Sequence, residues 1–231
     1  MLKPMFSTVA ETYDLSNKVL TFGLDKRWRK ACATEPANGN FVIDLCCGTG
    51  DLSFSLIQNL GDDSFLLGLD FNKEMLTKAV AKKSKSKWAS KDNFAFVIAD
   101  AAHLPLKDEC ADTVKISFSF RNLIYKNPNA NAYLKELNRT LKRHGKFTSV
   151  ETSQPRNRLI KSFFRFYCLR IVPLVGGWVS GAKPAYKYLG KSAANFPAPE
   201  DILTMFQKAG FSDAAFKPLS FGIVGLYMAT K

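Results

Sequence analysis

The chain has 231 residues, of which 46% are hydrophobic, and a formal net charge of +13. A chain of this length can bury a substantial core, so we expect one domain rather than two. No apolar run reaches the roughly eighteen residues of a transmembrane helix, and the first residues lack the long apolar segment of a secretory signal. These observations predict a cytoplasmic protein without a membrane-spanning helix.

Five cysteines, at positions 32, 46, 47, 110 and 168, lack the paired spacing of metal ligands, so we expect reduced thiols and no metal site. The adjacent Cys46 and Cys47 are candidates for nucleophilic catalysis. However, the chain has two histidines, His103 and His144, and neither stands in a recognisable triad context. We therefore interpret both cysteines as small buried hydrophobic residues.

A buried-strand pattern runs directly into a glycine turn in the segment FVIDLCCGTGD, from Phe41 to Asp51. The strand residues are apolar and favour β-structure. Gly48 and Gly50 allow a sharp turn and a close approach of the backbone to a ligand, although Ser53 stands where the full dinucleotide motif has a third small residue. The segment predicts a cofactor-binding loop.

Two further apolar strands also end in an acidic residue. FLLGL, from Phe65 to Leu69, is followed by Asp70, and FAFVIA, from Phe94 to Ala99, is followed by Asp100. The carboxyl ends of parallel strands meet at one edge of a doubly wound sheet, so these acids are expected to converge on one crevice. Asp70 would accept hydrogen bonds from ribose hydroxyls. Alternatively, each acid only caps the following helix.

Helices and strands alternate through the rest of the chain, which is typical of a parallel α/β sheet. The expected helices are Asp51 to Leu60, Lys73 to Lys83 and Asn129 to Arg143; the further strands are Thr113 to Phe120 and Lys146 to Glu151; and Phe211 to Thr230 is a closing hairpin. His144 and Gly145 are predicted to turn the third helix into the fifth strand. The fold class is therefore α/β, a doubly wound Rossmann-like sheet with an antiparallel final hairpin.

The segment from Thr152 to Pro199 does not belong to a minimal sheet. It contains eight basic residues, eight aromatic residues and no acidic residue. Inserted before the final helix, it would form a helical cap over the strand ends, and such a composition suits an anionic membrane surface and a lipid-like substrate. The alternative is an ordinary cap with solvated lysines. We expect a cover at 1–40, a cofactor-binding core at 41–151, the cap at 152–199 and a final helix and strands at 200–231.

The glycine turn and the strand-end acids resemble the class I S-adenosylmethionine-dependent methyltransferases. Nearly the whole chain resembles one family among them, the ubiquinone/menaquinone biosynthesis C-methyltransferases, which methylate a ring carbon of a polyprenylated quinol. The similarity is carried by MFSTVAETYDLSNKVLTFGLDKRWR, VIDLCCGTGD, LDFNKEML, SFSFRNL, VETSQP, RIVPLVGGWVSG, AYKYLGKSAANFP and GIVGLYMATK. Two departures are Ser119 in place of a family glycine and Lys142 to Gly145 in place of a Pro-Gly-Gly turn.

This resemblance implies S-adenosyl-L-methionine as the cofactor and a quinol as the substrate. It places the methionine end at Asp44 and the glycine loop, the ribose at Asp70 and the adenine at Asp100 and Ala101. The expected cofactor-binding residues are Asp44, Gly48, Thr49, Gly50, Asp70, Phe71, Asp100, Ala101 and Ser117.

A hydroquinone carbon becomes nucleophilic when the adjacent phenol loses its proton, so the site needs a base or a charge-stabilising donor at that oxygen. We expect Arg121 and Asn122, which follow the fourth strand, to orient the quinol oxygens. Tyr13 or Asp14, carried over the crevice by an N-terminal helix, is the expected proton acceptor. Alternatively, Asp14 caps a helix and Tyr13 packs in the core.

Two other residues near the strand ends have competing roles. His103 follows the predicted adenine segment directly, and we expect it to shape that loop rather than to act as a base. Glu151, at the end of the fifth strand, is a rival base or the ion-pair partner of Arg121.

Other classes of protein remain as alternatives. A binding module without catalysis would not need the intact set of glycines and acids. A nucleic-acid methyltransferase would suit the charge of +13, but the fourth strand ends in SFSFRN rather than in a loop for a flipped base. A methyltransferase of another lipophilic molecule is the nearer alternative. We expect an anionic membrane surface as a partner, with peripheral association, and no nucleic acid; the sequence leaves a homodimer open.

Overall fold

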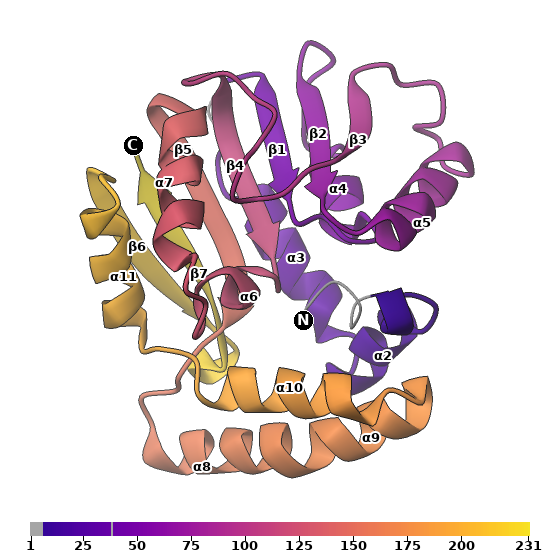
Figure 1. Cartoon of the computed structure of the whole chain (residues 1–231), viewed down its shortest axis with the longest axis vertical. Coiled ribbons are helices and arrows are strands. Elements are labelled where there is room, and N and C mark those ends of the chain that lie inside the picture. The colour runs from indigo at the N-terminus through magenta and orange to yellow at the C-terminus, as the bar shows by residue number, and fades with distance from the viewer. Residues whose placement is uncertain (1–6, 38) are drawn as a thin grey trace.

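The computed structural model describes residues 7–37 and 39–231, so residues 1–6 of the expected cover and residue 38 lie outside the described residues. Within the described part, seven strands form one sheet in the order β3-β2-β1-β4-β5-β7-β6 (Figure 1). The strands are β1 (Phe41–Leu45), β2 (Phe65–Asp70), β3 (Phe94–Ile98), β4 (Ala111–Ser117), β5 (Leu141–Thr152), β6 (Asp213–Leu219) and β7 (Val224–Thr230).

The first five strands pair in parallel, whereas β7 is antiparallel to both β5 and β6. The chain runs outward from β1 to β3 and then returns to β4 on the other side of β1. The strand order therefore reverses between β1 and β4, and this is the position where open α/β sheets bind ligands. The predicted α/β class with an antiparallel final hairpin is confirmed.

Helices cover both faces of the sheet. On one face, α3 (Leu24–Thr34) and α4 (Asp51–Leu56) contribute buried side chains to a cluster with β1 and β2. On the other, α7 (Ala130–Thr140) and α11 (Pro199–Lys208) pack against β4, β5 and β7. Phe120 and Phe206 stack there with ring centroids 5.6 Å apart. Burial of these apolar faces is what holds the three layers together.

A further helical layer lies across the carboxyl ends of the parallel strands (Figure 1). It consists of α2 (Tyr13–Leu20), α8 (Arg158–Phe166), the π-helical turn η1 (Tyr167–Ile171), α9 (Val172–Ser180) and α10 (Lys183–Ala194). A cluster that includes Leu20, Val172 and Tyr186 joins α2 to the inserted helices. The hydroxyl of Tyr167 also donates a hydrogen bond to the carbonyl of Leu20, at 2.5 Å. The layer over the strand ends thus combines α2 with the inserted helices, whereas α3, which also belongs to the expected cover at 1–40, packs on a face of the sheet.

The inserted helices approach each other closely where α10 crosses η1. A Cβ atom added to Gly190 would lie 1.9 Å from the carbonyl oxygen of Cys168, so no larger residue fits without a backbone shift. The wider π-helical turn at Tyr167–Ile171 lies at this contact, and such turns interrupt the regular α-helical ladder. Within residues 7–37 and 39–231, no helix is both long and apolar enough to span a membrane.

One predicted boundary is wrong, because α7 ends at Thr140 and β5 begins immediately at Leu141. His144 has a φ of 62° and lies within the strand, where the pairing of β4 with β5 shifts register. The amide of His144 donates to the carbonyl of Lys231, and the amide of Lys231 donates to that of Gly145. This irregular stretch is therefore held by the C-terminal residue of the chain, which a local sequence pattern does not reveal.

Two other elements are shorter than expected. The fourth strand ends at Ser117 rather than Phe120, because Phe118 has a φ of 54° and leaves the extended conformation. The next helix, α6 (Phe120–Ile124), starts at once and carries Arg121 and Asn122. Likewise α4 ends at Leu56, four residues early. The helix α5 (Lys73–Ser84) agrees with its predicted range to within one residue.

Candidate active site

The glycine turn follows β1 as predicted and bends sharply. Gly48 and Gly50 have φ values of 55° and 83°, in the left-handed region that favours glycine. A Cβ atom added to Gly48 would meet no protein atom within 4 Å, so this part of the turn faces open space. A Cβ added to Gly50 would lie 3.1 Å from the ring of Phe96, so Gly50 instead allows close packing beneath the turn.

Asp70 holds the glycine turn in place from the end of β2. One of its carboxylate oxygens accepts a hydrogen bond from the amide of Gly48 and the other from the amide of Asn72, both at 2.8 Å. Burial raises the pKa of the Asp70 carboxyl. A carboxylate has about four acceptor positions, so these backbone bonds leave room for a hydroxyl group of a ligand.

Asp44 lies inside the protein, not on a cavity wall. Its carboxylate accepts a hydrogen bond from the hydroxyl of Ser53 at 2.5 Å, and burial raises its pKa to about 7. Among the described residues, none donates a hydrogen bond to its Oδ1 atom. An unsatisfied buried carboxylate oxygen is costly, and a cationic or hydrogen-bonding ligand nearby would reduce that cost.

A cavity of about 540 Å³ opens at the carboxyl ends of the strands. Nine of the residues expected to bind cofactor or substrate line it: Tyr13, Gly48, Thr49, Asp70, Phe71, Asp100, Ala101, Ser117 and Asn122. The other four, Asp14, Asp44, Gly50 and Arg121, are not among the lining residues. The fold therefore brings predicted residues that are up to about a hundred positions apart in the sequence to one cavity.

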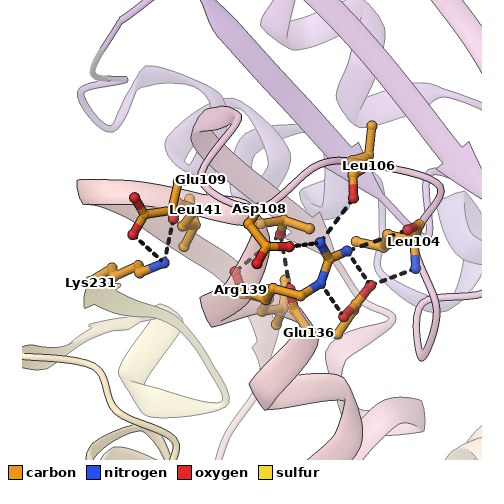
Figure 2. A network of polar contacts seen from close by, with 10 residues as sticks. Leu104, Leu106, Asp108, Glu109, Glu136, Arg139, Leu141 and Lys231 are labelled. Carbon is orange, nitrogen blue, oxygen red and sulfur yellow. Dashed lines mark hydrogen bonds and ion pairs between the residues drawn. The ribbon is translucent and has the colours of Figure 1, made fainter.

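The loop that carries Asp100 and Ala101 is braced by α7 (Figure 2). Arg139 donates to the carbonyls of Leu104 and Leu106, and Glu136 accepts from the amide of Leu104 at 2.7 Å. The backbone of His103 bonds back to Asp100 as an isolated bridge. These contacts fix the loop, and His103 takes part in shaping it through its backbone.

Asp14 fastens the N-terminal cover to the glycine turn. The hydroxyl of Thr49 donates to Asp14 at 2.7 Å, and the ammonium group of Lys82 lies 2.7 Å from both Asp14 and Asp51. Both carboxylate oxygens of Asp14 are thus engaged, one by the glycine turn and the other by Lys82 of α5. Its role as a proton acceptor stays a prediction.

Tyr13 and Arg29 lie at the inner end of the site. Burial raises the pKa of the Tyr13 phenol, while the positive charge of Arg29 opposes that shift. Arg29 is buried, forms an ion pair with Asp25, and lies 3.8 Å from Asp51. Sequence reasoning missed Arg29. The available signal was an Asp–Arg pair four residues apart on the same helical face as Trp28.

A second cavity, of about 440 Å³, lies between α2, α3 and the inserted helices. Its lining is mostly apolar and aromatic, including Leu20, Leu24, Phe118, Phe164, Val172 and Leu189. It shares four lining residues with the first cavity: Tyr13, Arg29, Asn122 and Tyr188. The first cavity, which carries the strand-end acids, is the more polar of the two, and it meets the apolar cavity at these four side chains.

Arg121 lines the apolar cavity, but its guanidinium group is engaged inside the protein. It forms a 2.7 Å ion pair with Glu151 and donates to the hydroxyl of Ser192 in α10. The pairing of Glu151 with Arg121, one of its two expected roles, is therefore present. The role of Arg121 toward a substrate oxygen stays a prediction.

Fold and site together define an α/β methyltransferase of the class that carries its cofactor loop after the first strand. The chain matches the family model of the ubiE/COQ5 methyltransferase family over residues 1–231, and it belongs to that family. It is 35% identical to the ubiquinone/menaquinone biosynthesis C-methyltransferase UbiE of Rickettsia prowazekii, covering 100% of this chain and 92% of that protein. It is also 35% identical to the demethylmenaquinone methyltransferase of Lactiplantibacillus plantarum, covering 98% and 94%.

Solved structures share the fold at low sequence identity. Human N-acetylserotonin methyltransferase in complex with SAM superposes with a TM-score of 0.67 at 15% identity, covering 100% of this chain and 59% of that one. A SAM-dependent methyltransferase from Aquifex aeolicus superposes with a TM-score of 0.58 at 16% identity, covering 84% and 83%. These likenesses support the predicted class of fold.

Proposed function

We propose that this protein transfers the methyl group of S-adenosyl-L-methionine to a ring carbon of a polyprenylated quinol, the reaction named for its relatives in quinone biosynthesis. The observation that carries the proposal is the meeting of the more polar first cavity with the apolar cavity at Tyr13, Arg29, Asn122 and Tyr188. A charged, hydrophilic cofactor suits the first cavity and a prenylated ring suits the second.

The polar cavity offers groups that fit this cofactor. The open side of the turn at Gly48 leaves space for a ligand against the backbone, and Asp70 and Asp100 supply carboxylates for hydroxyl and amino groups. The orphaned Oδ1 of Asp44 lies in the strand that leads into this turn. When bound, the cofactor supplies an electrophilic methyl group.

The protein residues at the junction orient the quinol and manage its charge. Asn122 lines both cavities, and its amide is suited to hydrogen-bond a ring hydroxyl. A tyrosine phenol is protonated at neutral pH, and burial raises the pKa of Tyr13 further, so Tyr13 is better suited to donate to the developing phenolate than to accept a proton. The nearby positive charge of Arg29 also stabilises a developing phenolate.

In this proposal Arg121 is a positioning residue for the helix α6. Its amide and its guanidinium group both bind Glu151, and these bonds hold α6 and therefore the neighbouring Asn122. The remaining requirements are to align the ring carbon with the methyl group and to exclude water. In this proposal the layer formed by α2 and α8 to α10, which lies over the strand ends, meets both requirements.

Support for an anionic membrane as the place of action comes from the 152–199 segment, with eight basic residues and no acidic one. A polyprenylated quinol partitions into lipid, so an enzyme that associates peripherally with the bilayer would meet its substrate there.

The test uses a quinone extract reduced with dithionite and cofactor labelled with deuterium in the transferred methyl group. We expect mass spectrometry to find one labelled methyl on the quinol ring, and the fragment masses to identify a benzoquinol or a naphthoquinol. Label found exclusively in water-soluble or nucleic-acid products would contradict the proposal.

A further inference from the structure

One long helical run, from α8 through η1 to α9, presents apolar side chains to the outside. None of the nine residues of α8 is buried, and Leu159, Phe163 and Phe166 are 72%, 74% and 60% exposed. Their spacings of four and three residues put them on one side of the helix. Leu174 and Trp178 in α9 are 64% and 87% exposed. We call these five residues the apolar face. Scattered single apolar residues are common on protein surfaces, but five large ones along one helical run indicate an interaction surface.

The charges beside the apolar face identify the partner. Arg158 and Lys161 are exposed in α8, and Arg170 is exposed in η1. Since the whole 152–199 segment contains no acidic residue, nothing on it repels a negatively charged surface. A helix with large apolar side chains on one side and basic residues on the other is suited to lie at the boundary between anionic headgroups and acyl chains.

The apolar cavity opens onto this same surface. Nearly all of its lining is buried or half-buried, but Phe22 and Phe163 are 84% and 74% exposed. Residues that line a cavity and are also largely exposed mark its mouth. Phe22 belongs to the turn between α2 and α3, where its φ is 53°, and Phe163 belongs to the apolar face. The mouth therefore lies between the N-terminal cover and α8.

We propose that the apolar face docks on an anionic bilayer and that the prenyl tail of the substrate passes directly from the lipid into the apolar cavity between Phe22 and Phe163. This inference rests on the proposed function for the identity of the tail. It adds the docking surface, its orientation and the route of the substrate. The inner end of the route is the junction at Tyr13 and Asn122, so the ring would lead and the tail would remain in contact with the lipid.

The docking surface is tested by co-sedimentation with phosphatidylcholine vesicles, with and without 30% phosphatidylglycerol (about this fraction gives a strongly anionic surface). The variants are Arg158→Glu/Lys161→Glu and Leu159→Ser/Phe166→Ser, none of which lines a cavity. The first variant replaces attraction to the anionic headgroups with repulsion, and the second removes apolar side chains that enter the interface, so both should bind at least about tenfold more weakly. Matched controls on α5 and the loop after it, Val80→Ser and Lys85→Glu, should bind as the wild type does. Equal binding of the wild type to both kinds of vesicle, or an equal loss of binding in the control variants, would overturn the proposed docking surface.

The route is tested with two substrates, a long-tailed quinol embedded in anionic vesicles and a quinol with a single isoprene unit dissolved in water. The two surface variants should methylate the short quinol at the wild-type rate and the embedded quinol about tenfold more slowly. Equal losses on both substrates, or no loss on the embedded one, overturn direct delivery. If the wild type methylates neither, the proposed function fails, while the vesicle experiment still decides the docking surface.

Discussion

Arg121 in α6 and Glu151 in β5 form an ion pair at 2.7 Å, with side-chain exposures of 2% and 0%. Glu151 also accepts a hydrogen bond from the amide of Arg121, and Arg121 donates to Ser192 in the cap. Two residues thirty positions apart thus connect the sheet, the helix that carries Asn122, and the inserted segment.

Breaking this ion pair from one side should destabilise the protein strongly. Arg121→Met leaves the carboxylate of Glu151 buried without its cation, which costs roughly 3–5 kcal/mol, whereas Arg121→Met/Glu151→Leu should recover much of that loss. Denaturant unfolding measures both variants. As a control, Arg156→Met removes the exposed ion pair with Glu200 and should cost less than about 1 kcal/mol. Equal effects at Arg121 and Arg156 would show that the burial of the pair is unimportant.

Removal of the Asp70 carboxylate should weaken cofactor binding. We expect Asp70→Ala to reduce the affinity for S-adenosyl-L-methionine and its product by about 1.5–3 kcal/mol, because hydrogen bonds to a charged acceptor are lost and the amide of Gly48 loses its partner. Calorimetry measures both ligands. Lys85→Glu, on the surface beyond α5, serves as the control. An Asp70→Ala variant with wild-type affinity would remove Asp70 from the cofactor site.

Asp44 should make stability fall as the pH rises toward neutrality. Its carboxyl has a pKa of about 7 in the folded protein, against 3.8 for an unperturbed group. Between these values the folded state holds a proton that the unfolded state has released, so the free energy of unfolding decreases with pH by up to about 1.4 kcal/mol per pH unit. Asp70 contributes in the same direction.

The Asp44→Asn variant should lose most of this slope because an amide does not titrate. Denaturant unfolding at several pH values between 5 and 7.5 compares it with the wild type. The test requires that the two proteins share the same far-ultraviolet circular dichroism at pH 5. Parallel pH profiles would mean that Asp44 is already ionised in the folded protein at pH 5.

The substrate should react in its reduced form. A quinol has a phenol whose deprotonation raises electron density on the attacking carbon, whereas the quinone lacks that electron source. We therefore expect methyl transfer to a polyprenylated quinone to require a reductant such as dithionite. The rate is followed by transfer of the labelled methyl group into the lipid fraction. Undiminished methylation of the oxidised quinone in air would rule out this mechanism.

Asn122 should act on turnover rather than on cofactor affinity. Asn122→Ala removes an amide from the junction of the two cavities, so we expect a large fall in kcat and little change in the dissociation constant of S-adenosyl-L-methionine. Single-turnover kinetics and calorimetry measure the two quantities separately. A variant that binds cofactor poorly but turns over normally once saturated would assign Asn122 to the cofactor site instead.

Local patterns in the sequence predict most of the cofactor side of the site. A strand, a glycine turn and two strand-end acids are recognisable because each depends on neighbours within a few residues, and the parallel order of the strands then brings Gly48, Asp70 and Asp100 to one cavity. The same locality explains the error at residues 141–145. The strand begins early there because Leu141 pairs with Ala111 of β4, and the backbone of Lys231, eighty-six residues beyond Gly145, then holds His144 and Gly145.

The sequence by itself determined the class of fold and the position of the cofactor loop, because backbone conformation and apolar periodicity are properties of short segments, and its motifs carried the resemblance to the family. The tertiary structure decided which polar groups face the cavities. Arg121 forms its ion pair with Glu151, and Asp14 forms one with Lys82. Arg29 lies at the junction of the two cavities. A buried charge takes the partner that packing supplies, and that partner comes from a distant part of the chain.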